Sequence, residues 1–315
     1  MILVTGGTGF IGQALIRRLV EDGEKVRVLL RPSKGNPDLP KGMPVDVAIS
    51  NITDRRSLQT AMIGVETVYH LVGGEWLGTS GDLNQIEILG TRTLIEVCKE
   101  AGVKHIIYLS HLGADRASAY PVLKVKGIVE EFIRKSGIKF SIIRSGLVFG
   151  PGDHFTADLA KLFSAFPFIF PIPGDGKTLV HPIWIEDLAA CLAWTRGMEE
   201  MENQTVEIGG PELLSIREVV QSVLDARGVR RRLVKMHPVN LRAAAVFFEY
   251  FFSGLPLSVY WIDYLAANRT CQIETISRVF GLLPERFRNH LDHVSVPRRS
   301  PSLFSLKTSK ERRKD

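Results

Sequence analysis

The first twelve residues constrain the fold of this chain more than any other segment. They read "MILVTGGTGFIG", an apolar strand-like stretch followed by a turn with glycines at Gly6, Gly9 and Gly12 and by a helix-like stretch. In such a unit the first glycine permits a tight turn, the second lets a pyrophosphate approach the backbone, and the third lets helix and strand pack closely. The N–H groups of the helix N-terminus then face the phosphates. The segment therefore predicts a dinucleotide-binding site.

Strand-like and helix-like segments alternate over the first half of the chain. The patterns predict strands and helices in turn, with strands at 2–7, 25–30, 66–73, 103–110 and from 139 onward, and helices at 9–23, 54–64, 83–102 and 122–137. This alternation predicts an α/β fold, a Rossmann-type doubly wound parallel sheet with helices on both faces. Such sheets bind ligands outside the carboxyl ends of their strands.

The chain is expected to divide into two folded parts and a tail. Residues 1–155 form the Rossmann dinucleotide-binding domain, and 178–225 return to it. Residues 156–177 and 226–296 form a smaller, mostly helical lobe for a substrate or partner. Residues 297–315 form a basic tail that is rich in Ser, Pro, Lys and Arg, a composition typical of disorder.

The tail holds most of the positive charge. The formal net charge is +6, and residues 297–315 carry seven Lys or Arg against Glu311 and Asp315, which leaves +5 in the tail. The rest of the chain is nearly neutral, which argues against a nucleic-acid partner. The tail is interpreted either as a solubilising extension or as a contact to an anionic membrane surface or an acidic partner.

Cysteine usage and the first residues indicate the compartment. Cys98, Cys191 and Cys271 are widely separated, so the sequence predicts neither a disulfide framework nor a metal site, and a reducing compartment is expected. His290 and His293 stand three apart but have no third ligand nearby. A strand at the very start leaves no room for a signal segment. We expect a cytoplasmic protein, with a peripheral position at the inner face of a membrane as the finer expectation.

The end of the second expected strand indicates which dinucleotide is bound. An NAD site usually has an acidic residue about 20 positions after the glycines. Here Arg31 stands 19 residues past Gly12, and no Asp or Glu lies between Val26 and Gly35. An arginine there can hold a 2′-phosphate through charge-assisted hydrogen bonds. We therefore favour NADP(H), with NAD(H) as the alternative.

Four motifs resemble one superfamily. "TGGTGFIG" at 5–12, "IIYLSHLGA" at 106–114, "IIRSGLVFGPGD" at 142–153 and "HPIWIEDLA" at 181–189 are similar to atypical and extended short-chain dehydrogenase/reductases of the NAD-dependent epimerase/dehydratase-like group. "VEEFIRKSGIKFSIIRSGLVFGPGD" and "RVFGLLPERFRNHL" resemble the branch that contains the accessory nucleotide-binding subunit of respiratory complex I.

The resemblance implies a set of cofactor contacts. The implied positions are Gly6, Thr8, Gly9, Phe10, Ile11 and Gly12 in the phosphate loop, Asn51 and Ile52 beside the adenine, Leu71, Val72 and Gly73 after the fourth strand, and Gly146, Leu147 and Val148 beside the nicotinamide. Asn51 departs from the Asp that the family usually has there.

The resemblance also implies a catalytic Ser–Tyr–Lys group. In that group a tyrosine donates the proton, a lysine four residues later lowers its pKa and holds the ribose, and a serine polarises the substrate oxygen. Ser110 matches the serine position. Tyr120 and Lys124 have the spacing of the pair.

A helical projection separates the two candidate lysines. At about 100° per residue, Lys126 falls on the edge of the apolar stripe, whereas Lys124 falls among charged residues. Counting back from "EEFIRKSG", the family register also puts the lysine at Lys126 and the tyrosine at Val122. Tyr120 precedes Pro121 and is expected to lie before the helix. We therefore expect Lys126 to hold the ribose, with Tyr120 swinging into the site as the alternative.

The segment "AAAVFFEYFFSGLPLSVYWIDYL" at 243–265 bears on ligand and partner. Gly254 and Pro256 interrupt it, and only 13 uncharged residues lie between Glu249 and Asp263, fewer than the roughly 20 apolar residues that span a bilayer. It is expected to form a helix pair that closes the lobe, or alternatively an apolar face toward a membrane protein complex or lipid. A pocket lined by it would suit a large apolar small molecule such as a quinone, sterol or isoprenoid.

Two functions follow from these observations. The first is an NADP(H)-binding structural or assembly factor of a membrane redox system of the complex I type, with weak or no standard catalysis. The second is an NADPH-dependent reductase or dehydrogenase of an apolar carbonyl or alcohol. A phenol beside the nicotinamide would favour the second, and its absence the first.

Overall fold

The computed structural model describes residues 1–32, 39, 42–73, 82–251 and 259–295. Within these residues, seven parallel strands form one sheet in the order β11-β6-β5-β4-β1-β2-β3. Their bounds are β1 Ile2–Thr5, β2 Val26–Leu30, β3 Asp46–Ile49, β4 Thr67–His70, β5 His105–His111, β6 Lys139–Ser145 and β11 Gln204–Ile208. The central strands are buried runs of β-branched and aromatic residues, as expected of a sheet that is covered on both faces.

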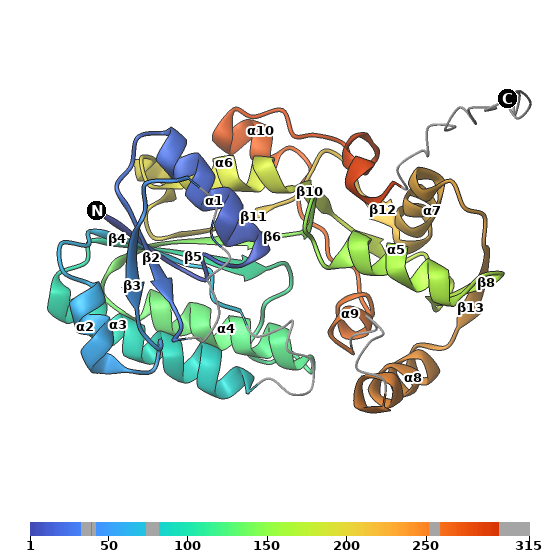
Figure 1. Cartoon of the computed structure of the whole chain (residues 1–315), viewed down its shortest axis with the longest axis horizontal. Coiled ribbons are helices and arrows are strands. Elements are labelled where there is room, and N and C mark those ends of the chain that lie inside the picture. Colours follow the sequence, from blue (N-terminus) through green and yellow to red (C-terminus); the bar gives the residue numbers. More distant parts are fainter. Residues whose placement is uncertain (33–38, 40–41, 74–81, 252–258, 296–315) are drawn as a thin grey trace, which may run out of the picture.

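Helices cover both faces of this sheet (Figure 1). One face carries α1 Phe10–Glu21, α6 Ile185–Thr195 and α10 Thr275–Phe280, and the other carries α2 Arg55–Ala61, α3 Gly90–Ala101 and α4 Pro121–Arg134. A π-helical stretch, η2 Asn84–Leu89, leads directly into α3. The predicted Rossmann-type α/β fold is therefore confirmed.

The second lobe lies beside the carboxyl edge of the sheet (Figure 1). Its helices are α5 Phe155–Ala165, α7 Ile216–Arg227, α8 Pro238–Phe251 and α9 Val259–Tyr264. Three short strand pairs complete it: β8 Ile169–Pro173 with β13 Arg232–Met236, β7 Leu147–Phe149 with β10 Pro182–Trp184, and β9 Leu179–Val180 with β12 Leu214–Ser215. The described residues also contain the 3-10 turns η3 Glu199–Met201, η4 Phe287–His290 and η5 Asp292–Val294.

Two helices pack differently from the expected division of the chain. The sequence placed 178–225 with the nucleotide domain, but α7 packs against α5 in the second lobe. It placed 226–296 with the lobe, but α10 packs against α6 and β11 of the sheet domain. The reason is that apolar periodicity marks the buried face of a helix without showing which element covers it. The predicted tail, 297–315, lies outside the described residues.

Candidate functional site

The glycine loop joins β1 to α1 at the carboxyl edge of the sheet. Gly6 has a φ of 75°, and a Cβ there would lie 2.7 Å from the carbonyl oxygen of Leu71. A Cβ on Gly12 would lie 2.2 Å from the carbonyl oxygen of Gly6. Gly9 is the N-cap residue of α1 and has no side chain that could occupy the first N–H groups of the helix. The loop thus has the close packing and the exposed donors that dinucleotide phosphates require.

The predicted adenine side lies beyond the ends of β2 and β3. Arg31 directly follows β2 and is exposed. The Asn51 Oδ1 accepts hydrogen bonds from the backbone N–H of Thr53 at 3.2 Å and from its hydroxyl at 3.1 Å, so the amide is turned into its own loop. Ile52 is buried beneath α3, where a Cβ on Gly90 would meet its Cγ2 at 2.7 Å. Their contacts with adenine and ribose stay predictions.

Ser110, the predicted catalytic serine, lies fully buried near the end of β5. Its hydroxyl donates to Glu130 Oε1 at 2.7 Å. Arg144 donates to the same carboxylate from Nε at 2.9 Å and from Nη2 at 2.7 Å, and Arg134 adds a bond at 2.6 Å. Burial alone would raise the pKa of Glu130, but these hydrogen bonds together hold that pKa below its ordinary value. The Ser110 hydroxyl therefore donates its hydrogen bond to a charged carboxylate, that of Glu130.

The two candidate lysines on α4 occupy opposite environments. Lys124 is exposed, whereas Lys126 is 3% exposed. The Lys126 Nζ lies 3.1 Å from Glu87 Oε2, in an ion pair that is buried on both sides. Val122, one turn before Lys126, is partly buried against the core of the second lobe. Tyr120 is the N-cap residue of α4 in extended geometry, so it precedes the helix. Their roles stay predictions.

A buried histidine connects the glycine loop to this lysine. His70 ends β4, and its Nδ1 lies 2.8 Å from the Thr5 hydroxyl while its Nε2 lies 2.9 Å from the Thr91 hydroxyl. Its ring stacks on Tyr108, over which Lys126 Nζ lies at 5.6 Å. Burial, with the charge of Lys126, lowers the pKa of His70 to about 3. The imidazole is therefore neutral and is fixed by two hydroxyl groups directly before Leu71, Val72 and Gly73 in the chain.

The predicted nicotinamide side is fixed by a second buried histidine. A Cβ on Gly146 would lie 2.0 Å from the carbonyl oxygen of His181, and Leu147 N–H donates to that oxygen at 3.0 Å. His181 is fully buried; its Nε2 lies 2.8 Å from the carbonyl oxygen of Gly210, and its Nδ1 lies 3.2 Å from the thiol sulfur of Cys271. His181 thus holds the 146–148 loop in place, a structural role. Val148 is partly buried beside α6.

The second lobe contains an apolar cavity of about 210 Å³. Side chains from α5, β8, α8 and α9 line it, among them Phe155, Phe170, Leu241 and Trp261. Asp158 stands among them, and burial raises the pKa of its carboxyl. The cavity offers van der Waals contact with little polar recognition, which suits an apolar group. No helix among the described residues is both long enough and apolar enough to cross a membrane.

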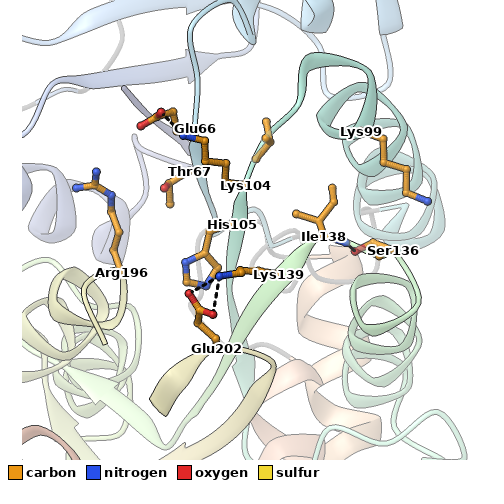
Figure 2. Close-up of a pocket in the computed structure, with 12 residues that line it drawn as sticks. Glu66, Thr67, Lys99, Lys104, His105, Ser136, Ile138, Lys139, Arg196 and Glu202 are labelled. Atoms are coloured by element: carbon orange, nitrogen blue, oxygen red, sulfur yellow. Dashed lines mark hydrogen bonds and ion pairs between the residues drawn. The ribbon is translucent and has the colours of Figure 1, made fainter. Parts of the chain in front are cut away.

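A different, polar pocket opens at the opposite edge of the sheet (Figure 2). Two of its three lysines are paired with carboxylates, Lys104 with Glu66 and Lys139 with Glu202, each at 2.7 Å. His105 lies beneath them with its Nε2 2.9 Å from a serine hydroxyl. This pocket lies at the amino ends of β4, β5 and β6, whereas Rossmann-type sheets bind ligands at the carboxyl ends. We therefore place the candidate site at the glycine loop.

The fold and the glycine loop together define an NAD(P)-binding protein of the short-chain dehydrogenase/reductase kind. More specifically, residues 1–181 match the NmrA-like family, to which the chain belongs. The resemblance to atypical members of the superfamily is thereby confirmed.

Curated proteins with different names are similar in sequence to this chain. The ceramide reductase of Caulobacter vibrioides is 28% identical over 78% of this chain and 77% of its own length. NADH dehydrogenase [ubiquinone] 1 alpha subcomplex subunit 9 of Arabidopsis thaliana is 25% identical over 74% of this chain, which spans only 59% of that relative. The NADPH-dependent quinone oxidoreductase of Escherichia coli superposes with a TM-score of 0.73 over 93% of this chain and 99% of its own, at 20% identity, which shows the shared fold alone.

Sequence reasoning missed several residues of the site. Glu87 and His70, which surround Lys126, carried no motif, and neither did Arg269, whose guanidinium lies 5.6 Å over the Tyr120 ring. Arg269 comes from a segment nearly 150 residues after Tyr120, and only the folded chain brings the two together. For these three residues the sequence offered one signal, a charged side chain among apolar residues of an expected helix, and only Glu87 shows it.

Proposed function

We propose that this protein binds NADP(H) at the carboxyl edge of its sheet and serves as a nucleotide-binding structural or assembly factor of a membrane redox system. One observation carries the proposal: the residue one turn before the buried Lys126 is Val122, so α4 presents no phenol in the position that a Ser–Tyr–Lys mechanism requires. The commitment of the Ser110 hydroxyl to Glu130 supports the same reading.

Two relatives whose names describe a subunit or an assembly factor support this reading. One is a subunit of NADH dehydrogenase, and another is the photosystem II assembly factor Ycf39 of Cyanophora paradoxa, 25% identical over 45% of this chain. In such a role the dinucleotide stabilises the fold, because a ligand that binds only the native state adds its binding free energy to stability.

The second candidate function is an NADPH-dependent reductase of an apolar carbonyl or alcohol. The apolar cavity of the second lobe favours it, and so do relatives named for reduction, such as the 2-alkyl-3-oxoalkanoate reductase of Stenotrophomonas maltophilia, 29% identical over 73% of this chain. In this reading Tyr120 would donate the proton from its place before α4.

Turnover measurements separate the two functions. We expect the protein to bind NADPH, seen as a change in nucleotide fluorescence, without oxidising it above background in the presence of decylubiquinone or a long-chain 3-oxoacid. Oxidation that Tyr120→Phe abolishes and that Tyr69→Phe, a buried tyrosine away from the site, leaves intact would establish the reductase instead. In the first reading, Val122→Tyr supplies a phenol in register with Lys126 and tests whether that position alone limits chemistry.

The cofactor preference rests on Arg31. It is exposed at the end of β2, where a 2′-phosphate would be held, and we expect tighter binding of NADP(H) than of NAD(H). Calorimetric titration of both cofactors should show that Arg31→Ala weakens NADPH binding by about tenfold, the loss of one charge-assisted contact, and leaves NADH binding nearly unchanged. Equal affinities of the unsubstituted protein for the two cofactors would refute the preference.

A peripheral position on a membrane is part of the proposal. Large apolar side chains are exposed along the elements farthest from the sheet (Figure 1), namely Phe168, Ile169, Val234, Val239, Val246 and Phe247. We call this set the distal apolar face. Phe168 is 83% exposed, and large apolar side chains exposed in this way can contact a membrane or a partner protein.

A further inference from the structure

Arg269 is held rigidly where the second lobe meets the carboxyl edge of the sheet. Its backbone N–H donates to the carbonyl oxygen of Leu179 at 2.9 Å, and the residue forms a bridge with Val180. The neighbouring Asn268 accepts a hydrogen bond from Leu179 N–H at 2.9 Å. The side chain then runs toward Gly113 in the loop after β5, where a Cβ would lie 2.8 Å from Nη1. The Arg269 backbone is thus fixed so that its guanidinium lies beside the loop after β5, at the candidate site.

Two nitrogens of the Arg269 guanidinium are buried without an acceptor among the described residues. Arg269 is 8% exposed, and among the described residues its Nε and Nη2 have no hydrogen-bond partner. Within the same described part of the chain, no carboxylate forms an ion pair with it. Burial of a charge without a partner is costly, and native proteins keep such groups mainly where they serve a function.

The two unpartnered nitrogens form one edge of the guanidinium. Nε and Nη2 carry parallel N–H bonds on the same side of the group, and this edge matches the two oxygens of a carboxylate or phosphate. An isolated donor could be satisfied by one water molecule. Two parallel donors on one edge are the arrangement that recognises an oxyanion in a bidentate manner.

Two tyrosine rings lie beside the guanidinium. Its central carbon lies 5.6 Å from the centroid of the Tyr120 ring and 5.9 Å from that of Tyr264. Aromatic rings favour a nearby cation without accepting its N–H donors as a carboxylate does, so these contacts do not replace an acceptor for Nε and Nη2. Tyr264 is also buried, with a hydroxyl that has no partner among the described residues, which adds a third donor to the same region.

We propose that Arg269 binds an oxyanion, the carboxylate or phosphate group of a second ligand that enters beside the dinucleotide. The phosphate loop follows β1, whereas Arg269 faces the loop after β5, which lies two strands away in the sheet. This placement separates its anion from the pyrophosphate. The inference holds for an enzyme and for a binding protein alike, so it does not rest on the proposed function.

The proposal is tested by calorimetric titration of the full chain loaded with NADPH. Hexanoate and hexyl phosphate are the anionic probes, and hexanol is the neutral control of equal length. We expect the anions to bind and hexanol to bind at least about tenfold more weakly, as loss of charge-assisted hydrogen bonds implies. Arg269→Lys keeps the positive charge but loses the two parallel N–H donors, and it should weaken anion binding by about tenfold or more. Arg278→Lys, at an exposed arginine bonded to Gln272, should have no effect.

The outcomes distinguish the sources of the anion. Preference for hexanoate assigns a carboxylate ligand, and preference for hexyl phosphate assigns a phosphate ligand. Equal anion affinities of Arg269→Lys and the unsubstituted protein overturn the proposal, and so does a loss confined to NADPH affinity, which would mean that the dinucleotide is the anion. If Arg269→Lys does not fold, a crystal structure of the unsubstituted protein with hexanoate decides, because the carboxylate must lie within hydrogen-bond distance of Nε and Nη2.

Discussion

Lys126 and Lys124 stand two residues apart on α4 and have opposite environments. Lys126 is buried against Glu87, and Lys124 is exposed. We predict that Lys126→Ala weakens NADPH binding by about tenfold or more, since it removes a cation at the site, while Lys124→Ala stays within the roughly 0.5 kcal/mol typical of surface substitutions. Fluorescence titration of both variants checks this. The reverse pattern would restore Tyr120 and Lys124 as the working pair.

Because Lys126→Ala removes one side of a buried ion pair, stability must be measured beside affinity. Breaking a buried ion pair on one side costs about 3–5 kcal/mol. The double variant Lys126→Met/Glu87→Leu removes both charges and should recover much of that loss. If the double variant is stable yet still fails to bind NADPH, the loss of binding belongs to the removed ion pair and not to unfolding.

His70 gives the stability of the protein a defined dependence on pH. Burial and Lys126 lower its pKa to about 3, whereas an unfolded histidine titrates near 6.5. The unfolded state therefore takes up a proton first as pH falls, so stability is lost progressively from about pH 6.5 downward, at about 1.4 kcal/mol per pH unit. His70→Gln cannot titrate, and its urea-derived free energy of unfolding should fall less steeply between pH 6 and 4. Identical slopes would contradict this.

At the scale of elements, α4 positions the candidate site through one glycine. A Cβ on Gly127 would lie 2.3 Å from the backbone nitrogen of Arg116 and 2.5 Å from the carbonyl carbon of Asp115. These are backbone atoms that cannot move aside, so Gly127→Ala should destabilise the protein by about 1–3 kcal/mol and displace Lys126 from the site. Gly197→Ala, where the nearest such atom is 3.8 Å away, is the matched control. Urea unfolding and NADPH titration report the two effects, and equal behaviour of the variants would exclude this role.

At the scale of the whole molecule, membrane attachment should have two separable parts. The tail carries +5, and each basic residue near an anionic surface contributes at most about 1 kcal/mol, so deletion of 298–315 should remove salt-sensitive sedimentation with anionic vesicles. The double variant Phe168→Ser/Phe247→Ser, on the distal apolar face, should remove the sedimentation with vesicles that persists at high salt. Leu283→Ser, at a leucine outside that face that is as exposed as Phe168, should change neither the salt-sensitive nor the salt-resistant sedimentation. If the unsubstituted protein stays in the supernatant at low salt, the membrane position is wrong.

The sequence by itself determined the fold class and the phosphate loop. The spacing of Gly6, Gly9 and Gly12 requires a tight turn and a close helix, and both requirements are local, so they can be read from neighbouring residues. The same holds for α4, where helical periodicity places Lys126 inward and Lys124 outward. The edge strand β3 was not expected, because its residues are mostly exposed and give no apolar pattern.

The tertiary structure alone decided which side chains meet. Ser110 meets Glu130, Lys126 meets Glu87, and Arg269 meets Tyr120 only after strands and helices far apart in the chain have packed. Local periodicity reports which face of an element is buried, but the identity of the buried partner depends on which elements pack together. The glycine loop could therefore be recognised in the sequence, whereas the buried guanidinium beside the loop after β5 became visible only in the folded chain.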